Sequence, residues 1–225
     1  MRTMIGVVGL AVLASTAAAQ AGGATHQMKM DPDKNAQQAA PMPAGWMGRT
    51  DRTTQKIENA SLTAMGKGMH VKTGPAAIFW NPANTASGSY SVGATFAQSK
   101  DANAEHLEAY GLFWGGSSLD QEGSAYLYYV VRGDGKYLFN HRANSTTVHK
   151  ITDWTASPAL NKSDATGKVT NALEVRVGQD SIRLFANGKT VAAYAASGMT
   201  GGNAGVYGLR VNHNLDVHIE GFGKR

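Results

Sequence analysis

The last third of the chain alternates between apolar and polar positions in short runs. Leu173, Val175 and Val177 are separated by single residues that include a glutamate and an arginine, and a period of two places successive side chains on opposite faces of a strand. Asn187-Gly188 lies between two further runs of this kind. The pair suits a two-residue hairpin in which both positions need a positive φ. The pattern therefore predicts consecutive antiparallel strands, each with one buried face.

Comparable runs recur along most of the chain and are separated by short segments rich in turn residues. Asp134-Gly135 is a second hairpin signal, and only residues 102–107 resemble a helical turn. The predicted strands cover residues 61–65, 69–73, 76–80, 89–98, 108–114, 124–132, 136–142, 147–151, 172–177, 181–186, 190–195, 205–211 and 215–220. Many short strands joined by turns predict an all-β fold, a jelly-roll sandwich of two antiparallel sheets.

The N-terminus, residues 1–19, has the pattern of a secretory signal peptide. Arg2 precedes an apolar run over residues 4–13, and small residues at positions 17–19 form the expected cleavage site. The apolar run is shorter than the roughly 20 residues that a membrane-spanning helix needs. We therefore expect an exported protein, periplasmic or extracellular, that does not contact the membrane after cleavage.

Residues 20–43 differ in composition from the rest of the chain, being rich in Ala, Gln, Gly, Pro and Met. This composition predicts a disordered linker, followed by one domain over residues 44–225. Within the linker, His26, Met28 and Met30 carry imidazole and thioether groups, which are ligands that suit Cu(I). The segment is therefore either a copper-binding clasp or a linker that merely contains methionines.

Composition narrows the chemistry further. The chain has no cysteine, which excludes thiol catalysis, thiolate metal sites and disulfides. Its formal net charge is +5, but the Lys and Arg residues are scattered along the chain and form no run of three or more. Nucleic-acid binding would require a concentrated basic patch, so we expect no nucleic-acid partner.

An ordered series of aromatic, glycine-rich and charged fragments fills the second half of the chain. The fragments are AYGLFWGG at 109–116, YLYYVVRGDGKY at 126–137, Trp154 with residues 157–160, and residues 171–175, 185–189, 205–211 and 215–219. The series resembles the concanavalin A-like lectin/glucanase superfamily, especially the bacterial modules related to laminin-G and to the DUF1080 (3-keto-disaccharide hydrolase-like) group. The resemblance implies a jelly roll with one concave sheet. That superfamily includes carbohydrate-binding modules, glycosidases and structural domains, so the fold alone does not define a function.

The enzymes of this superfamily set a clear test for catalysis. Its retaining glucanases carry Glu-x-Asp-x-(x)-Glu on one strand, because alternate positions bring two carboxylates to about 5–5.5 Å. This chain has no such motif. The nearest pattern is Asp216, His218 and Glu220, which would share one strand face as an acid/base cluster, a set of metal ligands, or simply the solvated side of the strand. No catalytic set of the DUF1080 group maps onto these residues.

Sugar sites combine aromatic rings with planar hydrogen-bonding side chains. The candidate ligand-binding residues of this kind are Trp80, Asn81, Trp114, Tyr128, Arg132, His141, Arg142 and His213. Tyr126, Tyr128, Val130 and Arg132 would share one face of a strand, the ligand side if that sheet is concave. The alternative for each tryptophan and tyrosine is a place in the sandwich core.

Calcium is common in the superfamily. Oxygen ligands could come from Asp101, Asn103, Asn212 and Asp216, although no loop gathers a set of Asp and Asn residues. Beyond calcium we expect no cofactor.

Together these observations lead us to expect an exported, non-catalytic binding module. Its partner would be a glycan or another extracytoplasmic surface, held on the concave sheet. Two alternatives are a carbohydrate-active hydrolase of the DUF1080 type and a structural or protein-interaction domain.

Overall fold

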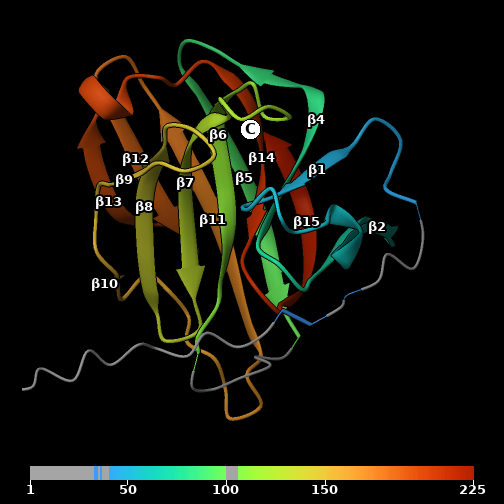
Figure 1. Cartoon of the computed structure of the whole chain (residues 1–225). Coiled ribbons are helices and arrows are strands. Elements are labelled where there is room, and N and C mark those ends of the chain that lie inside the picture. Colours follow the sequence, from blue (N-terminus) through green and yellow to red (C-terminus); the bar gives the residue numbers. More distant parts are fainter. Residues whose placement is uncertain (1–32, 35, 37–40, 100–105) are drawn as a thin grey trace, which may run out of the picture. The chain divides into compact units, whose positions relative to one another are not determined.

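The structure is a computed structural model that describes residues 33, 34, 36, 41–99 and 106–225. In this part of the chain there are fifteen strands and two short 3₁₀ helices, arranged as two facing sheets (Figure 1). Contacts divide the chain into Met1–Met30 and Asp31–Arg225, and everything below concerns the second unit. The predicted all-β fold is confirmed.

Sheet A has the strand order β1-β4-β14-β6-β7-β8-β10, with β9 also paired to β8. Its strands are β1 (Met47–Thr50), β4 (Ala77–Ala86), β14 (Gly205–Val211), β6 (Ala109–Ser117), β7 (Ala125–Arg132), β8 (Lys136–Arg142), β9 (Val148–Lys150) and β10 (Thr155–Ala156). All of these pairs are antiparallel. Strands distant in sequence lie side by side, since β14 is inserted between β4 and β6.

Sheet B has the order β13-β12-β11-β5-β15-β3-β2. Its strands are β13 (Lys189–Ala195), β12 (Ser181–Ala186), β11 (Val169–Val177), β5 (Tyr90–Gln98), β15 (Asp216–Lys224), β3 (Gly68–Thr73) and β2 (Ala60–Met65); the 3₁₀ helices are η1 (Ile57–Asn59) and η2 (Gly198–Thr200). Here too every pair is antiparallel. Two antiparallel sheets with such long-range pairings form the expected jelly roll.

The main core lies between the sheets and follows the alternation seen in the sequence. On β15, Val217 and Ile219 are fully buried, whereas the residues between them point away from the core. On β7, Leu127, Tyr129 and Val131 belong to this same core. Burial of these apolar faces supplies the main stabilisation of the sandwich.

Sheet A also has a buried apolar cluster on its outer face, which sheet B does not touch. Its centre contains Phe113 of β6, together with Tyr126 and Tyr128 of β7. Leu119, in the loop after β6, is buried in this cluster, and that loop is tied to β1 because the guanidinium of Arg49 donates to the carbonyl of Leu119. The loop therefore closes over part of the outer face.

The two predicted hairpins differ in geometry. Asn187 and Gly188 have φ of 52° and 77°, as the two-residue turn requires. In the other hairpin, Arg132 pairs with Lys136, and only Gly135 of the three connecting residues has a positive φ, 79°. That connection is a longer loop with one left-handed residue. The helical turn predicted over residues 102–107 lies largely outside the described residues.

The end of the predicted linker touches the sandwich. Asp33 contacts His213 with 2.6 Å between Oδ1 and Nδ1, and the backbone N–H of Lys34 donates to Asn214 at 2.7 Å. Met42 packs against the main core. Residues 1–32, 35 and 37–40, which include the predicted signal peptide and His26, Met28 and Met30, lie outside the described part. Within that part, no helix is long and apolar enough to cross a bilayer.

Candidate binding site

Three loops surround a depression of about 560 Å³ at one end of the outer face of sheet A. They follow β1, β6 and β8, and they gather at the upper end of sheet A in Figure 1. The lining residues are mostly polar: Asp51, Arg52, Thr53, Thr54, Glu122, Arg142, Ser145, Thr146 and Val148. Small-ligand sites are concave surfaces on which placed polar groups converge, so this depression is the first place to look for function.

An ionic cluster forms the floor of the depression. Both guanidinium nitrogens of Arg210 bond the two carboxylate oxygens of Asp51, at 2.8 and 2.7 Å. Arg142 reaches the same carboxylate at 3.1 Å, and its second terminal nitrogen donates to the carbonyl of Ser145. The cluster thus joins the loop after β1 to β14 and to the end of β8.

Aromatic rings of β7 support the two guanidinium groups. The Arg210 guanidinium lies 4.7 Å from the ring centre of Tyr128, and that of Arg142 lies 5.8 Å from the ring of Tyr126. Arg210 also donates to the Tyr126 hydroxyl at 3.1 Å, while the Asn140 amide donates to the Tyr128 hydroxyl at 3.1 Å. Because planar cations bind ring faces well, these contacts fix the orientation of both arginines.

The electrostatics of the cluster leave it positively charged. Burial by itself raises the pKa of the Asp51 carboxyl, but Arg210 and Arg142 outweigh this effect and lower that pKa to about 2. Burial also raises the pKa of Tyr126, so its hydroxyl stays neutral. At neutral pH the floor therefore holds one carboxylate between two guanidinium groups.

Only one of the predicted ligand-binding residues, Arg142, lines the depression. Trp80 and Tyr128 are on the same face but are only 3% and 5% exposed, which leaves no ring face free for a sugar. Trp114 is in the main core, stacked on Phe139 with ring centres 5.5 Å apart. The predictions that Trp80, Trp114 and Tyr128 form sugar-stacking platforms are therefore wrong, since neighbouring side chains already cover their rings.

The remaining predicted residues are dispersed over the surface. Arg132 lies at the far end of β7, where it bonds Asp134 and covers the ring of Trp154 at 4.4 Å. His141 pairs with Leu127 and so faces the other side of sheet A, stacked on His149.

Asn81 and His213 are committed to local contacts. The side-chain oxygen of Asn81 accepts the backbone N–H of Ala83, and His213 is held by Asp33 as described above. Neither residue lines the depression.

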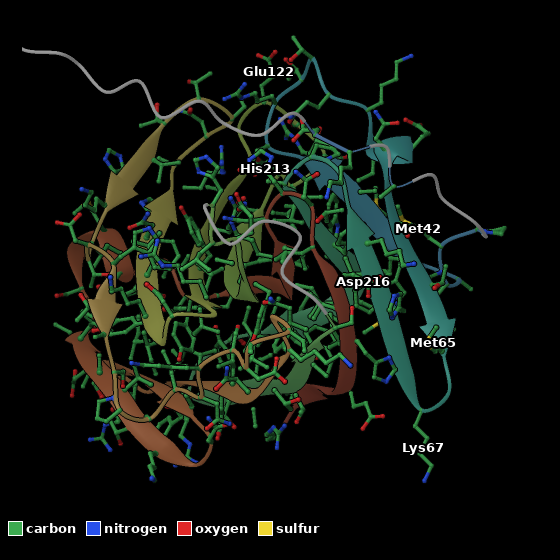
Figure 2. All side chains as sticks on the ribbon, turned by 90° about the horizontal axis from the view of Figure 1, so that it is seen from below. Met42, Met65, Lys67, Glu122, His213 and Asp216 are labelled. Atoms are coloured by element: carbon green, nitrogen blue, oxygen red, sulfur yellow. The ribbon has the colours of Figure 1, made fainter. Side chains whose placement is uncertain are left out.

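The predicted acid/base strand lies on the other sheet. Asp216, His218 and Glu220 point away from the core of sheet B, as the alternation predicted. His70 bonds Asp216 at 3.1 Å and His218 bonds Glu220 at 3.2 Å. Asp216 lies well apart from Glu122, which marks the depression on sheet A (Figure 2).

Metal-binding groups are not assembled in the part of the chain that the structure describes. There, no three His, Asp or Glu side chains are arranged to hold an ion. Asp101 and Asn103, named as calcium ligands, lie outside that part. Asp216 is already bonded to Lys72 and Ser99 as well as to His70.

Sequence reasoning did not identify Asp51, Glu122 or Arg210 as site residues. Asp51 follows β1, which is too short to show an alternating pattern. Arg210 had a visible signal, because it stands between Leu209 and Val211 on a strand whose apolar residues face the core. A long cation at such a position must find a partner on the outer face.

Fold and site together define a jelly-roll sandwich of two antiparallel sheets with a polar depression on the outer face of one sheet. The carbohydrate-binding module CBM66 from Bacillus subtilis has the same fold, with a TM-score of 0.57 and 14% identity over 82% of this chain and 99% of that one. A Bacillus subtilis protein of unknown function with a galectin-like fold gives a TM-score of 0.54 and 12% identity over 80% of this chain and 88% of that one.

A GH16 protein of the Bacteroides ovatus mixed-linkage glucan PUL, solved with a G4G4G3G product, is also similar. It gives a TM-score of 0.55 and 6% identity over 80% of this chain and 94% of that one. At these identities the likeness establishes the fold alone. No protein-family model and no curated protein matches the sequence.

Proposed function

We propose that the protein is an exported, non-catalytic module of the periplasm or cell exterior that binds a glycan in the depression on sheet A. The observation that carries the proposal is the depression itself, about 560 Å³ in volume with a rigid ionic floor and a wall of hydroxyl-bearing loops. Sugars are recognised by many hydrogen bonds to their hydroxyls. Threonines 53, 54 and 146 and the serine at 145 supply donors and acceptors of this type.

The comparisons support this proposal at the level of the fold. The sandwich is shared with a protein named as a carbohydrate-binding module and with one described as galectin-like. The described lining residues offer hydroxyls and guanidinium groups but no aromatic ring, which favours a shallow site of modest affinity.

A binding screen with a steric block tests the proposal. The purified protein is applied to immobilised plant and bacterial polysaccharides, with calcium and with a chelator, and the same wells are assayed for released sugar. Thr54→Trp places an indole in the depression and should abolish binding. Thr190→Trp, at an exposed position of the edge strand β13, is the matched control and should bind as the wild type does.

The outcomes separate the main proposal from its alternatives. Binding that survives Thr54→Trp would place the ligand elsewhere on the molecule. Loss of binding when calcium is chelated would show that the site requires calcium. Absence of binding to every glycan would overturn the proposal and favour a structural or protein-interaction role.

A hydrolase of the DUF1080 type is the second candidate, and one contact favours it. The His70 imidazole lies 3.1 Å from the Asp216 carboxylate on the outer face of sheet B, an arrangement that can move a proton. Release of sugar that disappears in Asp216→Asn or Glu220→Gln would establish the enzyme. Release that persists in both variants would exclude this cluster as its source.

A further inference from the structure

The charges around the depression are unequal in number. Arg52 and Arg142 line it, and Arg210 lies beneath it, bonded to Asp51. A fourth arginine, Arg49, lines a small neighbouring pocket that also contains Asp51 and Arg142. Against these four arginines stand two carboxylates, those of Asp51 and Glu122. One carboxylate is shared by two guanidinium groups, as described above. Two positive charges are thus left without a counter-charge among these six side chains.

The second observation is that the Arg142 guanidinium is buried and lacks one of its hydrogen bonds. Its side chain is only 9% exposed, it lines the depression, and its Nε has no hydrogen-bond partner among the described residues. A buried guanidinium with an unmade bond is costly in free energy. The Arg142 guanidinium at the wall of the depression therefore has bonding capacity that the described residues do not use.

The other two arginines, Arg52 and Arg49, point in the same direction. Arg52 lines the depression at an exposed position, and no ion pair joins it to another described residue. Arg49 uses its guanidinium on the carbonyls of Leu119 and Gln121, which are neutral acceptors. No carboxylate of the described residues pairs with either arginine.

We propose that the ligand of this depression is an acidic sugar whose carboxylate is bound by Arg52 and Arg142, while the threonines of the loops bind its hydroxyls. The proposal rests on the proposed function and specifies its ligand class. Guanidinium groups bind carboxylates through paired, charge-assisted bonds. The Glu122 carboxylate on the rim repels the carboxylate of such a ligand and so lowers its affinity.

Matched pairs of oligosaccharides test the charge of the ligand. Trisaccharides of galacturonate, mannuronate and glucuronate are compared by calorimetry with their methyl esters, which keep the sugar and the linkage and remove the charge. We expect at least one acid to bind about tenfold or more tightly than its ester, and its affinity to fall with added salt.

Two substitutions on the rim of the depression should change the affinity for the acidic sugar in opposite directions, and so locate the charges that bind it. Arg52→Gln should weaken binding of the acid by about tenfold, since it removes a charge-assisted bond. Glu122→Gln should tighten it about two- to fivefold by removing a like charge. Arg183→Gln, an exposed arginine on β12 of sheet B, changes the net charge as Arg52→Gln does and should leave the affinity unchanged.

The results distinguish failure of this inference from failure of the proposed function. Equal binding of acids and esters, blocked by Thr54→Trp, would overturn the acidic ligand and keep the glycan site. Equal weakening by Arg52→Gln and Arg183→Gln would show a non-specific attraction to a basic protein and overturn the assignment to this depression. Binding of no sugar, charged or neutral, would overturn both.

Discussion

At the scale of single residues, Asp51 is the side chain on which the outer face of sheet A depends. It is the only carboxylate in contact with Arg210 and Arg142 among the described residues. The burial of ions is unfavourable unless their partners are close and well oriented. Here the partners also stack on tyrosine rings, which makes the cluster rigid as well as paired.

Asp51→Asn should therefore be strongly destabilising. It leaves two buried guanidinium groups without a counter-charge, and we expect the free energy of unfolding to fall by about 3–5 kcal/mol at pH 7. The measurement is urea unfolding, with Asp180→Asn, a substitution at an exposed turn position, as the control. A loss below about 1 kcal/mol would contradict the importance of the pair.

The contribution of the Asp51 ion pairs to the free energy of unfolding should decrease at acidic pH. The pKa of Asp51 is about 2 in the folded protein, below the roughly 3.9 of an unfolded chain. A lowered carboxyl pKa stabilises the fold above the unfolded value, and this stabilisation is lost as pH falls from about 4 towards 2. The difference in free energy of unfolding between wild type and Asp51→Asn should therefore be smaller at about pH 2.5 than at about pH 5. A constant difference between the two would contradict the assignment.

At the scale of elements, the hairpin between β12 and β13 depends on its turn. Gly188 has φ of 77° and open space around its Cα, so a side chain there meets strain in the backbone rather than a clash. Gly188→Val should destabilise the domain by about 1 kcal/mol or more. Gly202→Val, with equal space and no positive φ, should cost less in the same thermal unfolding experiment. Equal costs would contradict the conformational explanation.

Elements with strong alternation were predictable from the sequence, and those without it were not. The predicted bounds of β8, β12 and β14 agree with the structure, because each alternates clearly and ends at a turn residue. β1 and β10 have four and two residues, too few to show a period. The rings of Trp80 and Trp114 could not be assigned, because a sheet with buried side chains on both faces has the same pattern whether loops or ligands cover it.

At the scale of the whole molecule, the last residues before the sandwich belong to it. Composition predicted a disordered linker over residues 20–43, but Asp33, Lys34 and Met42 contact the domain. A chain beginning at residue 31 should keep the melting temperature of the full chain. A chain beginning at residue 44 should melt about 3–6 °C lower, since it loses these contacts.

Thermal unfolding of the two truncated proteins provides the measurement. Equal melting temperatures would show that the contacts of Asp33 and Met42 add nothing to stability and would restore the linker prediction in full. A lower melting temperature for the chain beginning at residue 31 would show instead that residues 1–30 also stabilise the sandwich.

The position of β1 at the border of sheet A has a kinetic consequence. β1 is held by a single ladder of four residue pairs to β4, and strands at a border open more often than those in the middle of a sheet. The loop that carries Asp51 follows this strand directly. Brief detachment of β1 would therefore remove the shared carboxylate from both arginines at once. The lifetime of the assembled site is then set by the rate at which β1 detaches, which is faster than the rate at which the whole sandwich unfolds.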